Sequence, residues 1–163
     1  MMNRRARAAN WLFLITFALT FYGMGASFIE GFVNYPTWRL VGADEFRTFH
    51  QTLSPLGIGY MVVPLMLATV LTIALLWLRP AAIPLWLIAL SIALRLVTGV
   101  STFTIQIPIQ MELSSGGLSL PLIERLIFTD LWLRKVPMLI NSALFLWMMS
   151  LLLRRAEVRR SEA

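Results

Sequence analysis

The chain has 163 residues, of which 58% are hydrophobic and only 13% are charged, and its mean hydropathy is +0.75. A water-soluble domain of this length could not cover so much apolar surface, so the composition excludes an ordinary soluble protein and predicts a membrane protein. The lack of cysteine excludes disulfides, thiolate metal sites and cysteine nucleophiles. No nucleic-acid partner is expected, because the net charge of +6 is concentrated beside apolar segments.

Four segments are long and apolar enough to cross a bilayer, which takes roughly 20 helical residues. They are 11–32, 57–78, 82–105 and 134–153. Only "LRPAAIP" (78–84) separates the second segment from the third, which predicts a tight helical hairpin. We therefore expect one all-α integral membrane domain over residues 1–163, built as a bundle of four transmembrane helices.

The second and fourth helices are predicted to extend beyond the membrane. Arg134 and Arg154 are 20 residues apart, about 30 Å of helix and one hydrocarbon thickness. The amphipathic pattern before Arg134 nevertheless starts near Pro121, which suits a first helical turn. His50 precedes Arg79 by 29 residues, about 44 Å of straight helix, and would stand above the bilayer.

The rest of the outer layer is expected to consist of loops, namely "NYPTWRLVGA" (34–43) and "MELSSGGLSL" (111–120). Asp44 is expected to cap the start of the helix that contains "DEFRTFHQTL". Pro55 and Pro64 are expected to bend that helix. These features predict a partly ordered cap on the non-cytoplasmic side.

The charges predict the orientation. Eight cations and two acids flank one end of the bundle: Arg4, Arg5, Arg7, Arg79, Arg154, Arg155, Arg159 and Arg160, with Glu157 and Glu162. The other six cations and six acids cancel. The positive-inside rule therefore places both termini in the cytoplasm. Arginine outnumbers lysine by 13 to 1, which is typical of a GC-rich bacterial genome and predicts the plasma membrane.

Polar residues inside the spans recur at helical spacing. On the third span they are Ser91, Arg95, Thr98, Thr102 and Gln106, which follow one helix face. The other spans carry similar faces. Such faces avoid lipid, and their small and hydroxyl residues are expected to pack helix against helix in the bundle interior.

Arg95 is the costly member of this face. It lies 11 residues beyond Pro84, about 17 Å along the helix and near mid-bilayer. An arginine there costs roughly 2.5–3.5 kcal/mol. Asn141 has a matching depth and Glu30 lies nearer the outer boundary, so we expect Arg95 to pair with Asn141 and, directly or through water, with Glu30. Two interpretations stay open: a structural ion pair, and a polar pocket open to the outside.

His50 is the only histidine. With no second histidine and no cysteine, no conventional metal site and no cofactor are expected. Haem or a metal held through His50 is the remaining alternative, beside a structural role and a role in proton transfer. Trp38 lies in the first outer loop beside Tyr35, where it would cover a pocket mouth or rest on the lipid headgroups.

Three stretches carry a family resemblance: "GASFIEGFVNYPTW" (25–38), "FRTFHQTLSP" (46–55) and "DLWLRKVPMLIN" (130–141). Together with the polar third span, this arrangement resembles the anthrone-oxygenase-like family of small four-span membrane proteins, and the likeness covers most of the chain. The resemblance implies oxidation of an electron-rich polycyclic phenol by O₂ without a dedicated redox cofactor.

The resemblance also implies site residues. His50 would match the base that deprotonates the substrate, and Trp132, Arg134 and Asn141 would match the residues that open span four. The chain departs from the family at that opening, because Lys135 and Asn141 stand where a further histidine is expected.

The leading expectation is a membrane-embedded oxygenase-like enzyme that oxidises a flat phenolic or other small hydrophobic substrate in an outward-opening pocket. Its catalytic residues would be His50, Arg95 and Glu30. Substrate would be bound by Tyr35, Trp38, Phe49, Gln106, Trp132, Arg134 and Asn141. One alternative is an accessory or assembly subunit of a larger membrane complex, with a partner membrane protein; another is a small-molecule or lipid carrier. The bilayer is the partner common to all three.

Overall fold

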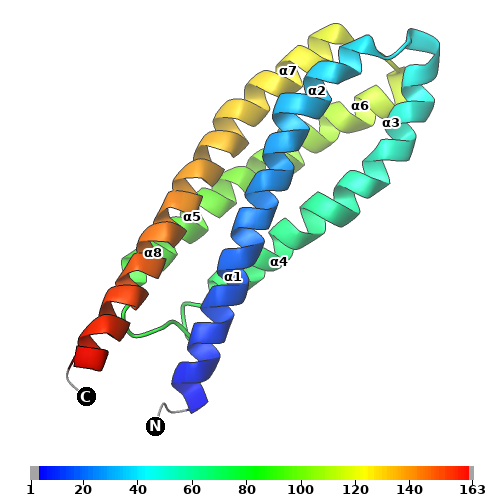
Figure 1. Cartoon of the computed structure of the whole chain (residues 1–163). Coiled ribbons are helices and arrows are strands. Elements are labelled where there is room, and N and C mark those ends of the chain that lie inside the picture. Colours follow the sequence, from blue (N-terminus) through cyan, green and yellow to red (C-terminus); the bar gives the residue numbers. More distant parts are fainter. Residues whose placement is uncertain (1–3, 162–163) are drawn as a thin grey trace.

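The computed structural model describes residues 4–161, without the side chains of Arg159 and Arg160; Glu162, counted above for the charge, lies outside that range. It consists of four long helical segments, called rods below: Arg4–Leu40, Ala43–Ala74, Leu85–Gly116 and Leu120–Val158. All four are long and apolar enough to cross a membrane. The expected all-α four-helix bundle is therefore confirmed (Figure 1).

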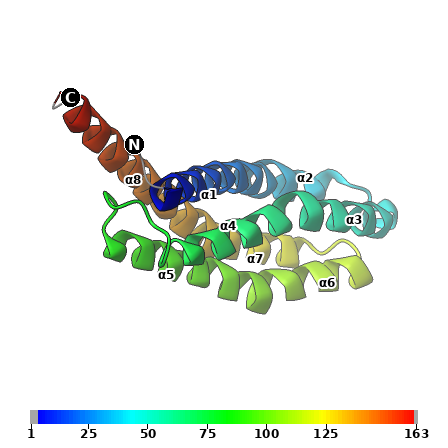
Figure 2. The ribbon, with the colours of Figure 1, turned by 90° about the horizontal axis from the view of Figure 1, so that it is seen from below.

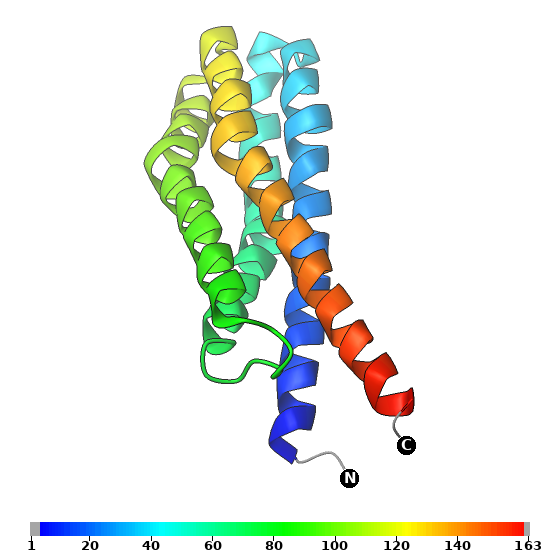
Figure 3. The ribbon, with the colours of Figure 1, turned by 90° about the vertical axis from the view of Figure 1, so that its left-hand side faces the viewer.

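The rods pack in chain order around the bundle. At the end that carries both termini, α1 (Arg4–Ile29) contacts α4 (Val63–Ala74), α4 contacts α5 (Leu85–Ser101), and α5 contacts α8 (Val136–Ser161), which returns to α1. The connection between α4 and α5 is short, as the hairpin prediction requires. It crosses that same end as an irregular loop (Figure 3).

The opposite end of the bundle is a helical cap. It contains α2 (Tyr35–Thr37), η2 (Trp38–Leu40), α3 (Ala43–Gly57), α6 (Ile107–Gly116) and α7 (Leu120–Asp130). The extensions of the second and fourth helices are as expected. Most of both expected outer loops is helix instead, because 34–40 and 111–116 continue the first and third rods; only 41–42 and 117–119 are non-helical. Seen from below, α3 and α6 lie at the right-hand end of the bundle, far from both termini at the upper left (Figure 2).

The start of α3 also differs from expectation. Gly42 occupies the capping position, and its carbonyl accepts the N–H groups of Glu45 and Phe46 at 3.1 and 2.9 Å. Asp44 lies inside the first turn and makes no capping bond. Its carboxylate is still well placed, since acidic residues in the first turn complement the helix dipole.

Two apolar cores hold the bundle together. The first lies towards the termini and is built around Phe13, Leu75, Leu87 and Phe145. The second lies in the cap and is built around Trp38, Phe46, Ile109, Leu113 and Ile123. Most buried polar side chains lie between these two cores and form a middle layer; His50, in the cap core, is an exception.

Each rod passes this middle layer through a π-turn: Glu30–Asn34, Ile58–Val62, Thr102–Gln106 and Leu131–Lys135. A proline follows two residues after each turn, at positions 36, 64, 108 and 137. The residue before each proline donates its N–H to the carbonyl five residues earlier, for example Val136 to Leu131. A proline lacks an N–H and crowds the carbonyl four residues earlier, so the wider turn accommodates it.

Candidate functional site: a cavity in the middle layer

Arg95 lies in the middle layer on α5 and is only 8% exposed. Its Nη2 donates a hydrogen bond to Thr20 Oγ1 at 2.6 Å, and its guanidinium carbon lies 5.7 Å from the centre of the Phe145 ring. Its Nε is buried without an acceptor. No carboxylate of residues 4–161 lies within ion-pair distance of this guanidinium.

The expected pairing of Arg95 is therefore wrong. Asn141 Oδ1 instead accepts a hydrogen bond from Ser91 Oγ at 2.5 Å. Glu30 Oε2 accepts one from Asn34 Nδ2 at 2.6 Å, within its own π-turn. Arg95 and Asn141 have matching depths and line the same cavity. Glu30 does not join them, because its amide partner lies one turn along the same rod.

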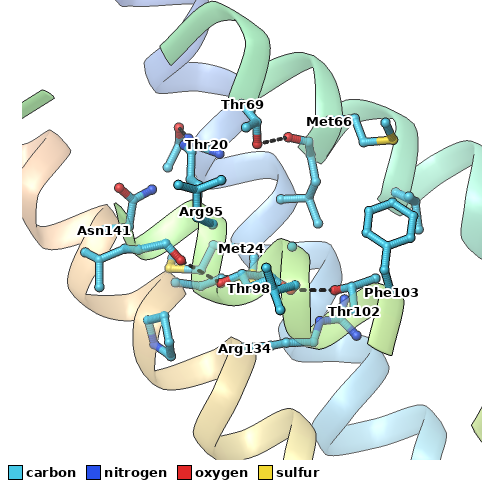
Figure 4. Close-up of a pocket in the computed structure, with 18 of the residues that line it drawn as sticks. Thr20, Met24, Met66, Thr69, Arg95, Thr98, Thr102, Phe103, Arg134 and Asn141 are labelled. Atoms are coloured by element: carbon cyan, nitrogen blue, oxygen red, sulfur yellow. Dashed lines mark hydrogen bonds between the residues drawn. The ribbon is translucent and has the colours of Figure 1, made fainter. Parts of the chain in front are cut away.

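A cavity of about 490 Å³ lies beside Arg95 (Figure 4). Its polar lining comes from several rods, and its remaining wall is apolar, with Met24, Leu65 and Met138 among the contributors. The polar lining residues are Thr20, Thr69, Arg95, Thr98, Thr102, Thr104, Arg134, Asn141 and Ser142. This volume falls within the range of small-molecule sites in proteins.

Most hydroxyl groups of the wall are already engaged as donors, but Ser142 Oγ is buried without a hydrogen-bond partner. Thr69, Thr98 and Thr102 each donate to the carbonyl four residues earlier on their own helix, at 2.9, 3.2 and 2.8 Å. They offer a ligand only methyl groups and acceptor lone pairs. The charged donors in the wall are the guanidinium groups of Arg95 and Arg134, and a guanidinium has five N–H groups.

The cavity opens sideways, between α4 and α5. Met66 and Val70 on α4 belong to its wall and are 53% and 61% exposed. Val100 and Phe103 on the facing rod also belong to the wall and are 60% and 59% exposed. Residues that face outward at this level of a membrane bundle face the lipid chains. The opening therefore differs from the expected one, which faced the outer aqueous side.

Arg134 belongs to a buried charge cluster next to the cavity, formed by Asp130, Arg134 and Lys135. Asp130 is 1% exposed and binds Lys135 Nζ through Oδ2 at 2.5 Å and Arg134 Nη1 through Oδ1 at 3.2 Å. Lys135 also donates to Ser27 Oγ on α1 at 2.9 Å. One carboxylate thus serves two buried cations.

The π-turn Leu131–Lys135 makes this cluster sterically feasible. In an α-helix, residues five apart point about 140° away from each other. The π-turn brings Asp130 and Lys135 to one face. The same geometry recurs on the third rod, where Ser101 Oγ donates to Gln106 Oε1 at 2.8 Å across the π-turn Thr102–Gln106.

His50 lies in the cap core instead of the cavity and is 1% exposed. Its ring stacks on Phe46 at 5.6 Å and meets the edge of Trp38 at 4.9 Å. Nε2 lies 2.7 Å from Gln110 Oε1, and Nδ1 lies 2.8 Å from Ser114 Oγ. With an amide oxygen facing it, Nε2 carries a proton, and the neutral ring accepts from the serine hydroxyl through Nδ1. Both ring nitrogens therefore hold α3 to α6.

The other expected substrate-binding residues are spread over the molecule. Tyr35 and Trp38 are buried in the cap core and cover no opening. Phe49 and Trp132 are 39% and 56% exposed and lie outside the cavity wall. Gln106 is engaged by Ser101, as described above. Of the expected site residues, only Arg95, Arg134 and Asn141 line the cavity, whereas Tyr35, Trp38 and His50 lie together in the cap core.

Sequence reasoning missed several functional candidates. The sequence pattern predicted only helix packing for Thr98, did not single out Thr20 for a functional role, and did not indicate that Lys135 is buried, at 3% exposure. No group of three or more histidine, aspartate or glutamate side chains suited to a metal occurs in the described part of the chain. Comparison of the chain with models of known families, with curated proteins and with solved structures returns no match.

Proposed function

We propose that the protein binds a hydrophobic molecule with an acidic group in the cavity between α4 and α5, and that Arg95 is the counter-ion of that group. The main supporting observation is that the charges in the middle layer do not balance. Three cations, Arg95, Arg134 and Lys135, are buried there, against the carboxylates of Asp130 and the half-buried Glu30. One positive charge is left over, and Arg95 is the cation without an ion-pair partner among the described residues.

An uncompensated charge is costly inside a bilayer, and an intramembrane ion normally has a partner or a water-filled cavity. Here an apolar cavity adjoins the charge. An anionic ligand group would accept the N–H donors of Arg95, and its hydrocarbon part would fill the remaining wall. The sideways opening supports delivery of such a ligand from the bilayer.

Binding is better supported than oxidation. Deprotonating a phenol requires a base within hydrogen-bond reach of the substrate. The described cavity wall has no histidine, carboxylate, lysine, tyrosine or cysteine. A phenol that arrives as its phenolate would still meet Arg95, so the substrate class implied by the family resemblance is one ligand class that this proposal includes.

We also propose that the protein lies in the plasma membrane with the end that carries both termini in the cytoplasm. Eight of its 14 basic residues flank that end. Such an excess of arginine near membrane spans is retained on the cytoplasmic side. The cap would then lie outside.

The binding proposal is tested with a fluorescent long-chain polyene acid, parinaric acid, and its methyl ester, using protein in phosphatidylcholine liposomes. Binding is followed by energy transfer from tryptophan. The ester has the same chain without the charge. Arg95→Gln should weaken binding of the acid by roughly 10- to 100-fold, because a charge-assisted hydrogen bond contributes about 1.5–3 kcal/mol. It should leave binding of the ester nearly unchanged.

Two controls make this test specific. Arg125→Gln removes an exposed cap arginine and should leave both affinities unchanged. Gly99→Leu adds bulk at a cavity-wall glycine whose added Cβ would meet nothing within 4 Å, and it should weaken acid and ester alike. Equal binding of the acid by wild type and Arg95→Gln would overturn the counter-ion assignment. Unchanged binding in Gly99→Leu would show that the ligand does not bind in this cavity.

A further inference from the structure

A second cavity, of about 670 Å³, lies at the end that carries both termini. Three arginines from different parts of the chain line it: Arg5 on α1, Arg79 in the connection between α4 and α5, and Arg155 on α8. The termini-side core around Phe13 and Leu87 separates this level of the bundle from the middle layer. The two cavities are thus independent.

The chemistry of this second cavity is that of an anion site. No acidic residue occurs among its described lining residues, and Arg79 and Arg155 each bring a positive charge to it. Arg79 is held in place by a bond from its Nε to the carbonyl of Ile83 at 3.1 Å. Its remaining N–H groups form the planar fork that suits two oxygens of a phosphate.

Small side chains create the space. Five small apolar side chains line the cavity and leave it its space: Ala6, Ala9, Ala81, Ala82 and Ala156. Trp77 stands at the rim and is 70% exposed. Tryptophan at the end of a transmembrane helix favours the level of the lipid headgroups. A ligand at this level has its charge at the rim and its apolar part against the bundle.

We propose that this second cavity binds the phosphate group of an anionic phospholipid from the adjacent leaflet. Basic pockets between transmembrane helices hold lipid headgroups in this way, and each arginine near the surface contributes to the attraction. The alanine walls accommodate the glycerol end of the lipid beneath its phosphate. Neither Arg95 nor any other residue that lines the middle-layer cavity takes part in this site.

The test measures binding of phosphatidylglycerol to the detergent-purified chain by native mass spectrometry. Arg79→Gln/Arg155→Gln should weaken binding by about thirtyfold, from two lost arginine contacts. The matched control is Arg39→Gln/Arg125→Gln, which removes the same net charge from exposed cap positions and should bind as wild type. Thermal midpoints of all variants in the same detergent show that each remains folded. Ala6→Leu, which narrows the cavity without changing the charge, should also weaken binding.

Three results would overturn the proposal. Wild-type affinity in Arg79→Gln/Arg155→Gln would show that these arginines do not hold the lipid. An equal loss in the cap control would show diffuse attraction to the net charge. Competition by inorganic phosphate or glycerophosphate at the same concentration as the lipid would identify a free phosphate as the ligand and exclude the lipid.

Discussion

At the scale of single residues, the charge cluster depends on glycine at position 31. Gly31 is buried on the first rod where that rod passes Asp130 and Lys135. A Cβ added there would lie 2.5 Å from Asp130 Oδ2 and 2.6 Å from Lys135 Cε. The absence of a side chain is what lets the first and fourth rods approach with an ion pair between them.

Gly31→Ala is therefore expected to lower the thermal midpoint of the protein in detergent. The new methyl must displace the carboxylate or the lysine stem, and breaking a buried ion pair costs about 3–5 kcal/mol. The comparison is Gly25→Ala on the same rod, whose added Cβ meets nothing within 4 Å. That variant should be neutral or slightly more stable, since alanine favours helix over glycine by roughly 1 kcal/mol. Equal midpoints for the two variants would contradict the close approach.

The sequence was informative about residues whose position follows from helical rise, and uninformative about their partners. Arg95 and Asn141 share a cavity because their depths match. The partner of Arg95 turned out to be Thr20, a hydroxyl on another rod that looks like many packing threonines. His50 looked available for chemistry, but Gln110 and Ser114 satisfy both ring nitrogens. Both belong to α6, which ends in a stretch expected to be a loop.

At the scale of elements, the π-turns explain much of what the sequence did not reveal. Standard helical periodicity puts Asp130 and Lys135 on different faces, so no α-helical pattern could pair them. The available signal was the prolines at 36, 64, 108 and 137, one inside each long apolar rod. Of these four prolines, only Pro64 was expected to bend a helix. The structure shows the same local solution in all four rods, always between the two apolar cores.

Pro64 leaves the carbonyl of Tyr60 without the N–H that an α-helix would supply. Tyr22 on α1 donates its hydroxyl to that carbonyl at 2.8 Å. Membrane helices tolerate proline where a neighbouring helix satisfies the released backbone group. The second rod is thereby held to the first at its bend.

Tyr22→Phe should destabilise the protein by about 0.5–1.5 kcal/mol, the usual contribution of one hydrogen bond. In a Pro64→Ala background the same change should cost close to nothing, because the alanine N–H replaces the tyrosine hydroxyl. Thermal midpoints of the four proteins form a double-mutant cycle. Tyr60→Phe is the matched control, since its exposed hydroxyl has no partner in the described structure and should be dispensable. An undiminished cost of Tyr22→Phe in the Pro64→Ala background would contradict this role.

At the scale of the whole molecule, the two ends of the bundle differ in charge and in construction. Both termini lie at the end opposite the cap (Figure 1). The cap is an apolar core wrapped in amphipathic helices, whereas the terminal end contains the arginine-lined second cavity. Composition and hydropathy were enough to predict four spans and the tight hairpin between the second and third. They did not reveal how far the first and third rods continue into the cap, because 34–40 and 111–116 contain the glycine, proline and serine typical of loops.

The orientation is directly testable because the chain has no cysteine of its own. Ser115→Cys places a thiol on the exposed end of the cap, and Ala81→Cys places one in the exposed connection between α4 and α5. A membrane-impermeant maleimide should label Ser115→Cys in intact cells, and Ala81→Cys only after permeabilisation. The reverse pattern would place the termini outside and would contradict the positive-inside assignment.

Because the cavity opens sideways between α4 and α5, the relevant ligand concentration is the one in the bilayer. A ligand that arrives through that opening has already dissolved in the bilayer, so its chemical potential is set by its mole fraction among the lipids. Adding buffer to a membrane suspension would hardly change how much of the protein is occupied. Adding empty lipid would dilute the ligand in two dimensions and empty the cavity. For the proposed binding reaction, the surrounding bilayer is therefore the solvent, and the aqueous phase is only a reservoir.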